Sequence, residues 1–121
     1  MSEKSIINMP LRKVHALEIL HGKKKREYRA FTDYWVKRLA VCDDSNDKNL
    51  VTATKKIDSI HFYPYNNKWF LNYKVEAVDL CKVDDDFIKY FGEEVEAEKD
   101  SDIFVITLGE VLDTNLDYKV E

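Results

Sequence analysis

The chain has 121 residues, of which 45% are hydrophobic and 35% are charged, and its net charge at pH 7 is −4. That length fits one domain with a core of its own, and that composition excludes both a disordered chain and a membrane-embedded one. No stretch approaches the roughly 18 consecutive apolar residues that span a bilayer, and the N-terminus lacks the apolar run of a signal peptide. We therefore expect one cytoplasmic domain over residues 1–121.

The charge is unevenly distributed along the chain. Residues 1–41 carry ten Lys and Arg against four Asp and Glu, a balance of +6, whereas residues 42–121 carry nine against nineteen, a balance of −10. A polyanion is attracted to the first part and repelled by the second. If the protein binds nucleic acid, the N-terminal third is expected to make the contacts. Segments interleave in a fold, so the surface can still be less polarised than these counts.

The chain opens with a predicted strand and a predicted helix. Residues 5–9 suit a short strand that ends at Pro10. A helix is predicted over residues 11–21, and Gly22 stands where its C-terminal cap belongs. The apolar face of this helix is formed by Val14, Leu17 and Leu20 and widened by Ala16 and Ile19.

A second strand and a second helix are predicted next. Residues 25–31 suit a strand. Thr32 or Asp33 can cap a short helix, because both side chains accept hydrogen bonds from free backbone N–H groups. That helix would carry Trp35, Val36 and Leu39. The alternative is that residues 39–42 form the next strand, and the sequence leaves both readings open.

The rest of the chain predicts a long hairpin, a helix and a final strand. In order, the elements are a polar loop over 43–49, strands over 57–65 and 69–80, a helix over 84–92 and a strand over 103–108. Apolar residues alternate in the second strand at Trp69, Leu71, Tyr73, Val75 and Ala77. Pro64 suggests an edge position or a bulge for the first strand, and the tail after Leu112 is expected to be irregular.

This element order predicts the fold class. A strand, a helix and a strand come first, and a long hairpin, a short helix and a strand follow. Such a mixed order fits an α/β mixed (α+β) fold, with a barrel or strongly bent sheet and two to three short helices plugging its ends.

One segment stands out as a candidate site. Lys23, Lys24, Lys25 and Arg26 are four consecutive cations, and Glu27 and Arg29 follow. Lysines at a helix C-terminus complement the helix dipole, and a Glu–Arg pair on one strand face is often an ordinary surface ion pair. Such a pair can also hold an arginine fork toward a phosphate or a base edge. The residue pattern alone leaves both interpretations open.

The segment from Met9 to Arg29 resembles the N-terminal motif of ASCH domains. That motif has a strand, a helix, a glycine, a lysine two residues on, a glutamate or threonine five on and an arginine seven on. Gly22, Lys24, Glu27 and Arg29 match those positions. The later helix and strand of the family resemble residues 87–92 and 103–106. The resemblance implies a PUA-like β-barrel with a cleft beside the first helix, in a family whose members bind RNA.

The resemblance implies two alternative functions. The first is a module that binds RNA, short single-stranded nucleic acid or a modified nucleotide through Lys23, Lys24, Lys25, Glu27, Arg29 and Trp69. The second is a small amidohydrolase-like enzyme, because some small members resemble hydrolases of acylated cytidine in which the motif lysine, here Lys24, is the nucleophile. Glu27 stands where those hydrolases keep a threonine, so this chain departs from them. A third possibility, from the residues alone, is an interaction module without chemistry.

For the other candidate residues, a packing role is the simpler interpretation. Tyr63, Tyr65, Trp69 and Phe70 surround the predicted hairpin and either pack or form a platform on which a base stacks. Trp35 is either a core anchor or a lid. His61 fits a hydrogen-bonded histidine within an apolar strand. Glu76 or Asp79 could bring a carboxylate to the cleft, and the sequence does not choose between them.

Metal and disulfide chemistry is not expected. Cys42 and Cys81 are far apart without a CxxC pattern, which favours two separate thiols. The three histidines have no metal-ligand spacing with either cysteine, and no metal or other cofactor is predicted.

Overall fold

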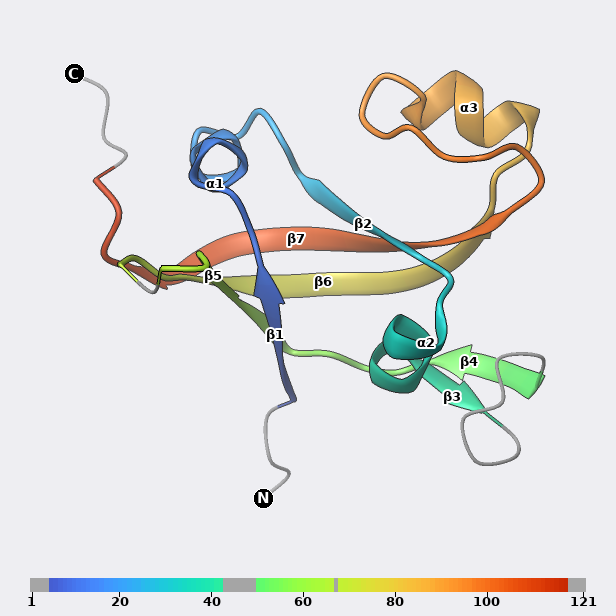
Figure 1. Ribbon diagram of the computed structural model, residues 1–121, viewed down its shortest axis with the longest axis horizontal. Coiled ribbons are helices and arrows are strands. Elements are labelled where there is room, and N and C mark those ends of the chain that lie inside the picture. The colour runs from blue at the N-terminus through green and yellow to red at the C-terminus, as the bar shows by residue number, and fades with distance from the viewer. Residues whose placement is uncertain (1–4, 43–49, 67, 118–121) are drawn as a thin grey trace. The chain divides into compact units, whose positions relative to one another are not determined.

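The computed structural model describes residues 5–42, 50–66 and 68–117. Over these residues it has three short helices, a sheet of order β1-β5-β6-β7-β2 and a second sheet formed by β3 and β4 (Figure 1). This confirms the predicted mixed α+β class. The elements are β1 (Ile6–Pro10), α1 (Lys13–Leu20), β2 (Arg26–Ala30), α2 (Asp33–Leu39), β3 (Ala40–Cys42), β4 (Val51–Thr54), β5 (Ser59–Tyr63), β6 (Leu71–Lys82), α3 (Asp85–Phe91) and β7 (Asp102–Thr114).

The chain divides into two compact units. Unit 1 comprises residues 1–27, 56–77 and 107–121, and unit 2 comprises residues 28–55 and 78–106. The long strands β6 and β7 run from one unit into the other, as does β2. Each unit buries apolar side chains of its own, and the two are described in turn.

In unit 1, β5 lies between two partner strands. It pairs in parallel with β1, from Ile6 opposite Ser59 to Pro10 opposite Tyr63, and antiparallel with β6. The predicted hairpin is therefore confirmed. The expected edge position for the strand before Pro64 is wrong, since β5 has a neighbour on each side. Pro64 follows the strand, where its missing N–H leaves no ladder bond unmade.

Helix α1 begins at Lys13 and packs through only part of the predicted apolar face. Ala16 and Ile19 are buried, whereas Val14 is 59% exposed. Leu17 and Leu20 are half-buried. Most residues of this short helix are apolar, so periodicity alone could not choose the face that meets the sheet.

The core of unit 1 comes from β1, α1, β5 and the first half of β6. Its buried apolar residues are Ile7, Met9, Leu11, Ala16, Ile19, Ile57, Ile60, Phe62, Trp69, Leu71, Val75 and Leu108. Along β6 the predicted apolar alternation holds at Leu71 and Val75 but ends there, because Ala77 is exposed.

In unit 2, residues 32–42 form both of the predicted elements, first the short helix and then the strand. The Thr32 hydroxyl accepts a hydrogen bond from the Trp35 backbone N–H (3.4 Å) and caps α2, as predicted. The chain then continues directly into β3, which pairs antiparallel with β4. The predicted polar loop over residues 43–49 lies outside the described residues.

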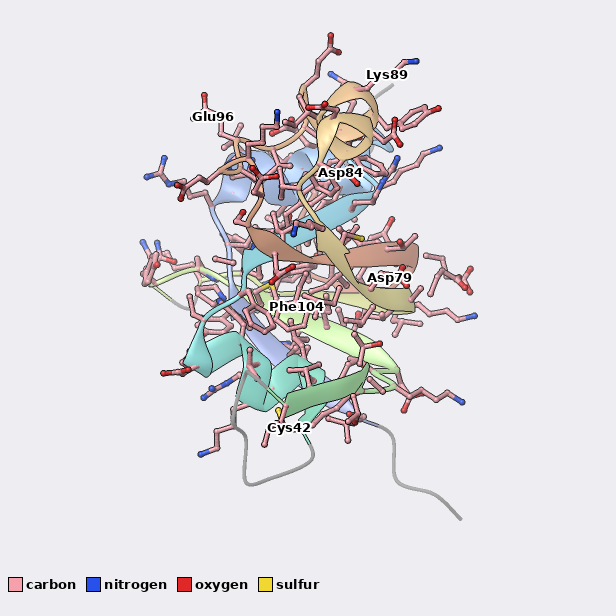
Figure 2. The ribbon with its side chains drawn as sticks, turned by 90° about the vertical axis from the view of Figure 1, so that its right-hand side faces the viewer. Cys42, Asp79, Asp84, Lys89, Glu96 and Phe104 are labelled. Atoms are coloured by element: carbon pink, nitrogen blue, oxygen red, sulfur yellow. The ribbon has the colours of Figure 1, made fainter. Side chains whose placement is uncertain are left out.

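Helix α3 begins and ends close to the predicted positions. The Asp84 carboxylate accepts from the Phe87 N–H (2.9 Å), and Lys89 lies in the last turn, where a cation complements the helix dipole (Figure 2). Gly92 ends the helix in a right-handed conformation rather than in a left-handed cap. Strand β7 continues through Thr114, so the tail expected to be irregular after Leu112 is partly strand.

The core of unit 2 contains a cluster of aromatic rings. The Tyr28 ring meets Phe87 edge-on at a centroid distance of 6.4 Å, and Phe91 packs against both. The Tyr28 hydroxyl donates to Glu94 Oε1 (3.1 Å), which satisfies its polar end. Val83, Ile103 and Val105 complete this cluster.

Candidate functional site

The basic segment begins in a tight turn after α1. Gly22 has φ +77°, a left-handed conformation that glycine adopts without a Cβ penalty. The Gly22 N–H donates to the Ile19 carbonyl (3.1 Å) and the Lys23 N–H to the Glu18 carbonyl (2.9 Å), the two bonds of a Schellman motif. Gly22 therefore caps the helix as predicted. The turn leaves Lys23 exposed and Lys24 half-buried.

Lys24 points inward and pairs with Glu27. Its Nζ lies 2.6 Å from Glu27 Oε1, an ion pair rather than a well-aligned hydrogen bond. Glu27 is 1% exposed and is the one charged side chain among the buried residues of the described chain. A carboxylate this deeply buried needs a counter-charge, since desolvating an unpaired charge costs several kcal/mol. This pair was not predicted from the sequence. Lys24 and Glu27 are three residues apart across a turn, a spacing that could have suggested it.

Arg29 lies in unit 2, and its contacts include a hydrogen bond to the backbone and an aromatic ring. Its Nη1 donates to the Tyr28 carbonyl (2.7 Å), and its guanidinium carbon lies 5.5 Å from the centre of the Trp35 ring. Trp35 is half-buried and meets the Tyr34 ring edge-on at 4.8 Å. Arg38 then covers Tyr34 at 3.5 Å. Trp35 thus belongs to a cation–aromatic cluster along α2, defined by Arg29, Tyr34, Trp35 and Arg38.

The aromatic residues around the hairpin differ in their contacts and in their exposure. The His61 ring stacks with Tyr63 and Phe70, and its Nδ1 lies 2.6 Å from the Asn72 side-chain oxygen. His61 is therefore a hydrogen-bonded histidine, as predicted. Trp69 is 9% exposed and lines a surface hollow, whereas Tyr65 is 87% exposed.

The two candidate cleft carboxylates are both exposed. Glu76 lies in unit 1, where its Oε1 is 3.9 Å from Lys74 Nζ, and a Cβ atom added to Gly109 would collide with its side chain. Asp79 lies in unit 2. The carboxylate that contacts Lys24 is instead Glu27.

Cys42 and Cys81 are half-buried free thiols. Burial raises the pKa of the Cys81 thiol, and the negative charges of Asp79 and Asp84 raise it further. Figure 2 labels both carboxylates, on β6 and at the start of α3. A raised pKa means a smaller thiolate fraction near neutral pH, and the thiolate is the reactive form.

The Cys81 thiol should therefore react slowly with iodoacetamide. In a Cys42→Ser background, we expect alkylation at pH 8 to be slower in the folded protein than in urea. Asp79→Asn should accelerate the folded-state reaction by about twofold, because it removes one of the charges that oppose ionisation. Asp113→Asn, an exposed acid of unit 1, is the matched control and should leave the rate unchanged. Equal acceleration by the two substitutions would contradict this account.

The folded chain separates the charges less than the sequence counts suggest. Over the described residues, unit 1 carries nine Lys and Arg against seven Asp and Glu, a balance of +2. Unit 2 carries seven against eleven, a balance of −4, and its acids concentrate in residues 78–106. The cations of residues 5–27 therefore belong to the less acidic unit.

The described part of the chain contains neither a metal-binding cluster nor a membrane-spanning helix. In residues 5–42, 50–66 and 68–117, no three His, Cys, Asp or Glu side chains gather closely enough to hold a metal ion. Within the same residues, no helix combines the length and the apolarity needed to cross a membrane. Comparisons with protein-family models, with curated proteins and with solved structures find no match.

Proposed function

We propose that the protein binds short single-stranded RNA or a nucleotide in unit 1, through Trp69 and the basic turn after α1, defined here as residues 23–26. Arg29 is proposed as a separate contact in unit 2. One observation carries this proposal. Residues 5–27 contain six Lys and Arg and two acids, and both acids have partners within the segment. Glu18 Oε1 lies 3.2 Å from His15 Nδ1, and Glu27 pairs with Lys24. Lys23 and Lys25 are exposed and can attract phosphates.

Two further features support the proposal. Gly22, Lys24, Glu27 and Arg29 match the ASCH pattern, a resemblance that implies RNA binding. Lys24 pairs with the buried Glu27 carboxylate, whereas its neighbours Lys23 and Lys25 are exposed. The acids of residues 78–106 would repel an extended polyanion, and a short ligand is therefore the better fit.

The test is a titration of the protein with a short single-stranded RNA, the matching DNA and a panel of modified nucleosides. We expect RNA binding to survive Lys24→Arg, which keeps the charge beside Glu27. Arg29→Ala should weaken it by about tenfold or more, because charge-assisted hydrogen bonds contribute about 1.5–3 kcal/mol each. Arg38→Ala, which removes the other arginine of the cation–aromatic cluster, is the matched control. Equal losses for the two arginines, or binding of neither RNA nor any nucleoside of the panel, would reject the proposal.

A second candidate function rests on the Lys24–Glu27 contact itself. A lysine acts as a nucleophile only after its ammonium gives up a proton, and the Glu27 carboxylate 2.6 Å away is placed to accept it. In this function the protein would add water across the amide of an acylated cytidine, releasing cytidine and the free acid. Lys24→Arg would abolish that release, since a guanidinium is not deprotonated near neutral pH. We expect no cytidine release by the wild type, and release that disappears in Lys24→Arg would establish the hydrolase instead.

A further inference from the structure

Unit 1 has a surface hollow of about 440 Å³ where the chain leaves two paired strands. Pro10, the last residue of β1, lies opposite Tyr63, the last residue of β5. The Leu11 N–H then donates to the Tyr63 carbonyl (2.9 Å), which extends the pairing by one residue. The segments that follow the two strands consequently lie side by side. They line the hollow with Leu11, Arg12, Lys13, Pro64, Tyr65, Asn66, Lys68 and Trp69.

The floor of the hollow is apolar and fixed. Leu11 and Trp69 are 7% and 9% exposed, and Pro64 is buried. In contrast to these buried side chains, the large aromatic side chain of Tyr65 is 87% exposed. Its ring therefore has a solvent-facing surface beside an apolar floor. Aromatic rings in such positions stack with nucleobases, at about 1–3 kcal/mol per base.

The rim of the hollow is cationic. Arg12, Lys13 and Lys68 are exposed, and none of the eight lining residues is an acid. An anionic group that enters the hollow meets three positive charges and no lining carboxylate to repel it. A volume of this size falls in the range of small-molecule sites, about 300–1,000 Å³.

A hollow of unit 2 has a rim of the opposite charge. That second hollow has about 470 Å³ and an apolar lining that includes Tyr28 and Phe31. Its rim carries Glu96, Glu98 and Asp102, so it repels the anions that the unit 1 hollow attracts. The two hollows are similar in size, and the charge of their rims distinguishes them.

We propose that the unit 1 hollow is a nucleotide subsite, in which Tyr65 stacks on the base and Arg12, Lys13 and Lys68 bind the phosphate. The inference rests on the proposed function, because it takes the ligand to be a nucleotide. It adds a second binding location, separate from the basic turn. The hollow lies at the start of α1 and the basic turn at its end, about 12 Å apart along an eight-residue helix. A single strand that follows α1 would contact both.

The probe is adenosine 5′-monophosphate, with adenosine and inorganic phosphate as separate arms. The readout is the indole N–H signal of Trp69 in NMR spectra, assigned by its persistence in Trp35→Phe. We expect the nucleotide to shift this signal saturably. Tyr65→Ala should lower the affinities for the nucleotide and for adenosine alike by about tenfold, since it removes the stacked ring. Arg12→Glu/Lys68→Glu should lower only the affinity for the nucleotide, by about tenfold or more.

Matched controls lie on α3 in unit 2, where Tyr90 is also exposed and Lys89 lies beside it. Tyr90→Ala and Lys89→Glu should leave nucleotide binding unchanged. The inference is overturned if these variants act like those of the hollow, or if the nucleotide moves the Trp35 and Trp69 signals equally.

A short RNA separates this inference from the proposed function. RNA that binds through Lys23 and Lys25 but is insensitive to Tyr65→Ala would reject the subsite and leave the proposed function standing. Nucleotide binding in the hollow that is unchanged in Lys23→Glu/Lys25→Glu, without RNA binding, would keep the subsite and reject the basic turn of the proposed function. If neither ligand binds, both are rejected.

Discussion

Lys24→Met should lower the free energy of unfolding by about 3–5 kcal/mol, because it removes the positive charge that Lys24 places beside the buried Glu27 carboxylate. Glu27 is 1% exposed, and Lys24 Nζ lies 2.6 Å from its Oε1. Domains of this size have a total stability of about 5–15 kcal/mol, so the loss would be a large part of it. Urea unfolding followed by tryptophan fluorescence measures the change.

Two variants make this prediction specific. In Lys24→Met/Glu27→Met both charges are gone, and most of the lost stability should return, because an apolar pair often replaces a buried ion pair at little cost. Lys23→Met removes an exposed neighbouring lysine and should change stability by less than about 0.5 kcal/mol. If Lys24→Met were no more damaging than Lys23→Met, the ion pair would contribute little to the fold.

The second large effect concerns the affinity for RNA. A ligand strand whose phosphates contact about four cations should lose about 50-fold in affinity between 50 and 200 mM salt, because each neutralised phosphate releases counterions. Lys23→Glu/Lys25→Glu removes two of these contacts. We expect it to weaken all RNA sequences alike, by about tenfold or more at low salt, and to make the salt dependence shallower. Fluorescence anisotropy of a labelled RNA at several salt concentrations measures both quantities.

The control for this charge reversal must change the net charge equally. Lys82→Glu/Lys89→Glu does so with two exposed lysines of unit 2. It should reduce RNA affinity far less, since only a local contact loses counterion release. If both double variants weaken binding to the same extent, general electrostatics explains the attraction and the basic turn is not the site.

Local signals predicted the element boundaries well where a side chain or a glycine fixes them. Thr32 and Asp84 each accept a hydrogen bond from the first turn of a helix, and Gly22 adopts the left-handed conformation expected after α1. These features depend on neighbours within a few residues, so the sequence contains all the information they need. Gly92 shows the limit, because it ends α3 without the left-handed turn that glycine often supplies there.

Contacts between distant segments could not be predicted from the sequence. Helix α1 has apolar residues around most of its circumference, and only the sheet it meets decides that Ile19 is buried and Val14 exposed. The inward direction of Lys24 depends on the course of the turn after Gly22. The hollow needs the parallel register of β1 with β5, which brings Arg12 and Lys13 to Tyr65 and Trp69. Trp69 was predicted as a binding residue, but its cationic neighbours were not.

The parallel pairing of β1 with β5 also affects the entropy of chain closure. In the β5–β6 hairpin, the bonded side chains of His61 and Asn72 are 11 residues apart, whereas Ser5 and Asp58, at the open end of the β1–β5 pair, are 53 apart. Closing the longer loop costs about 1.4 kcal/mol more in chain entropy. The hollow and the basic turn both follow β1 in the chain and take their places only when that loop is closed. The proposed binding surface therefore depends on contacts between segments that are far apart in the chain.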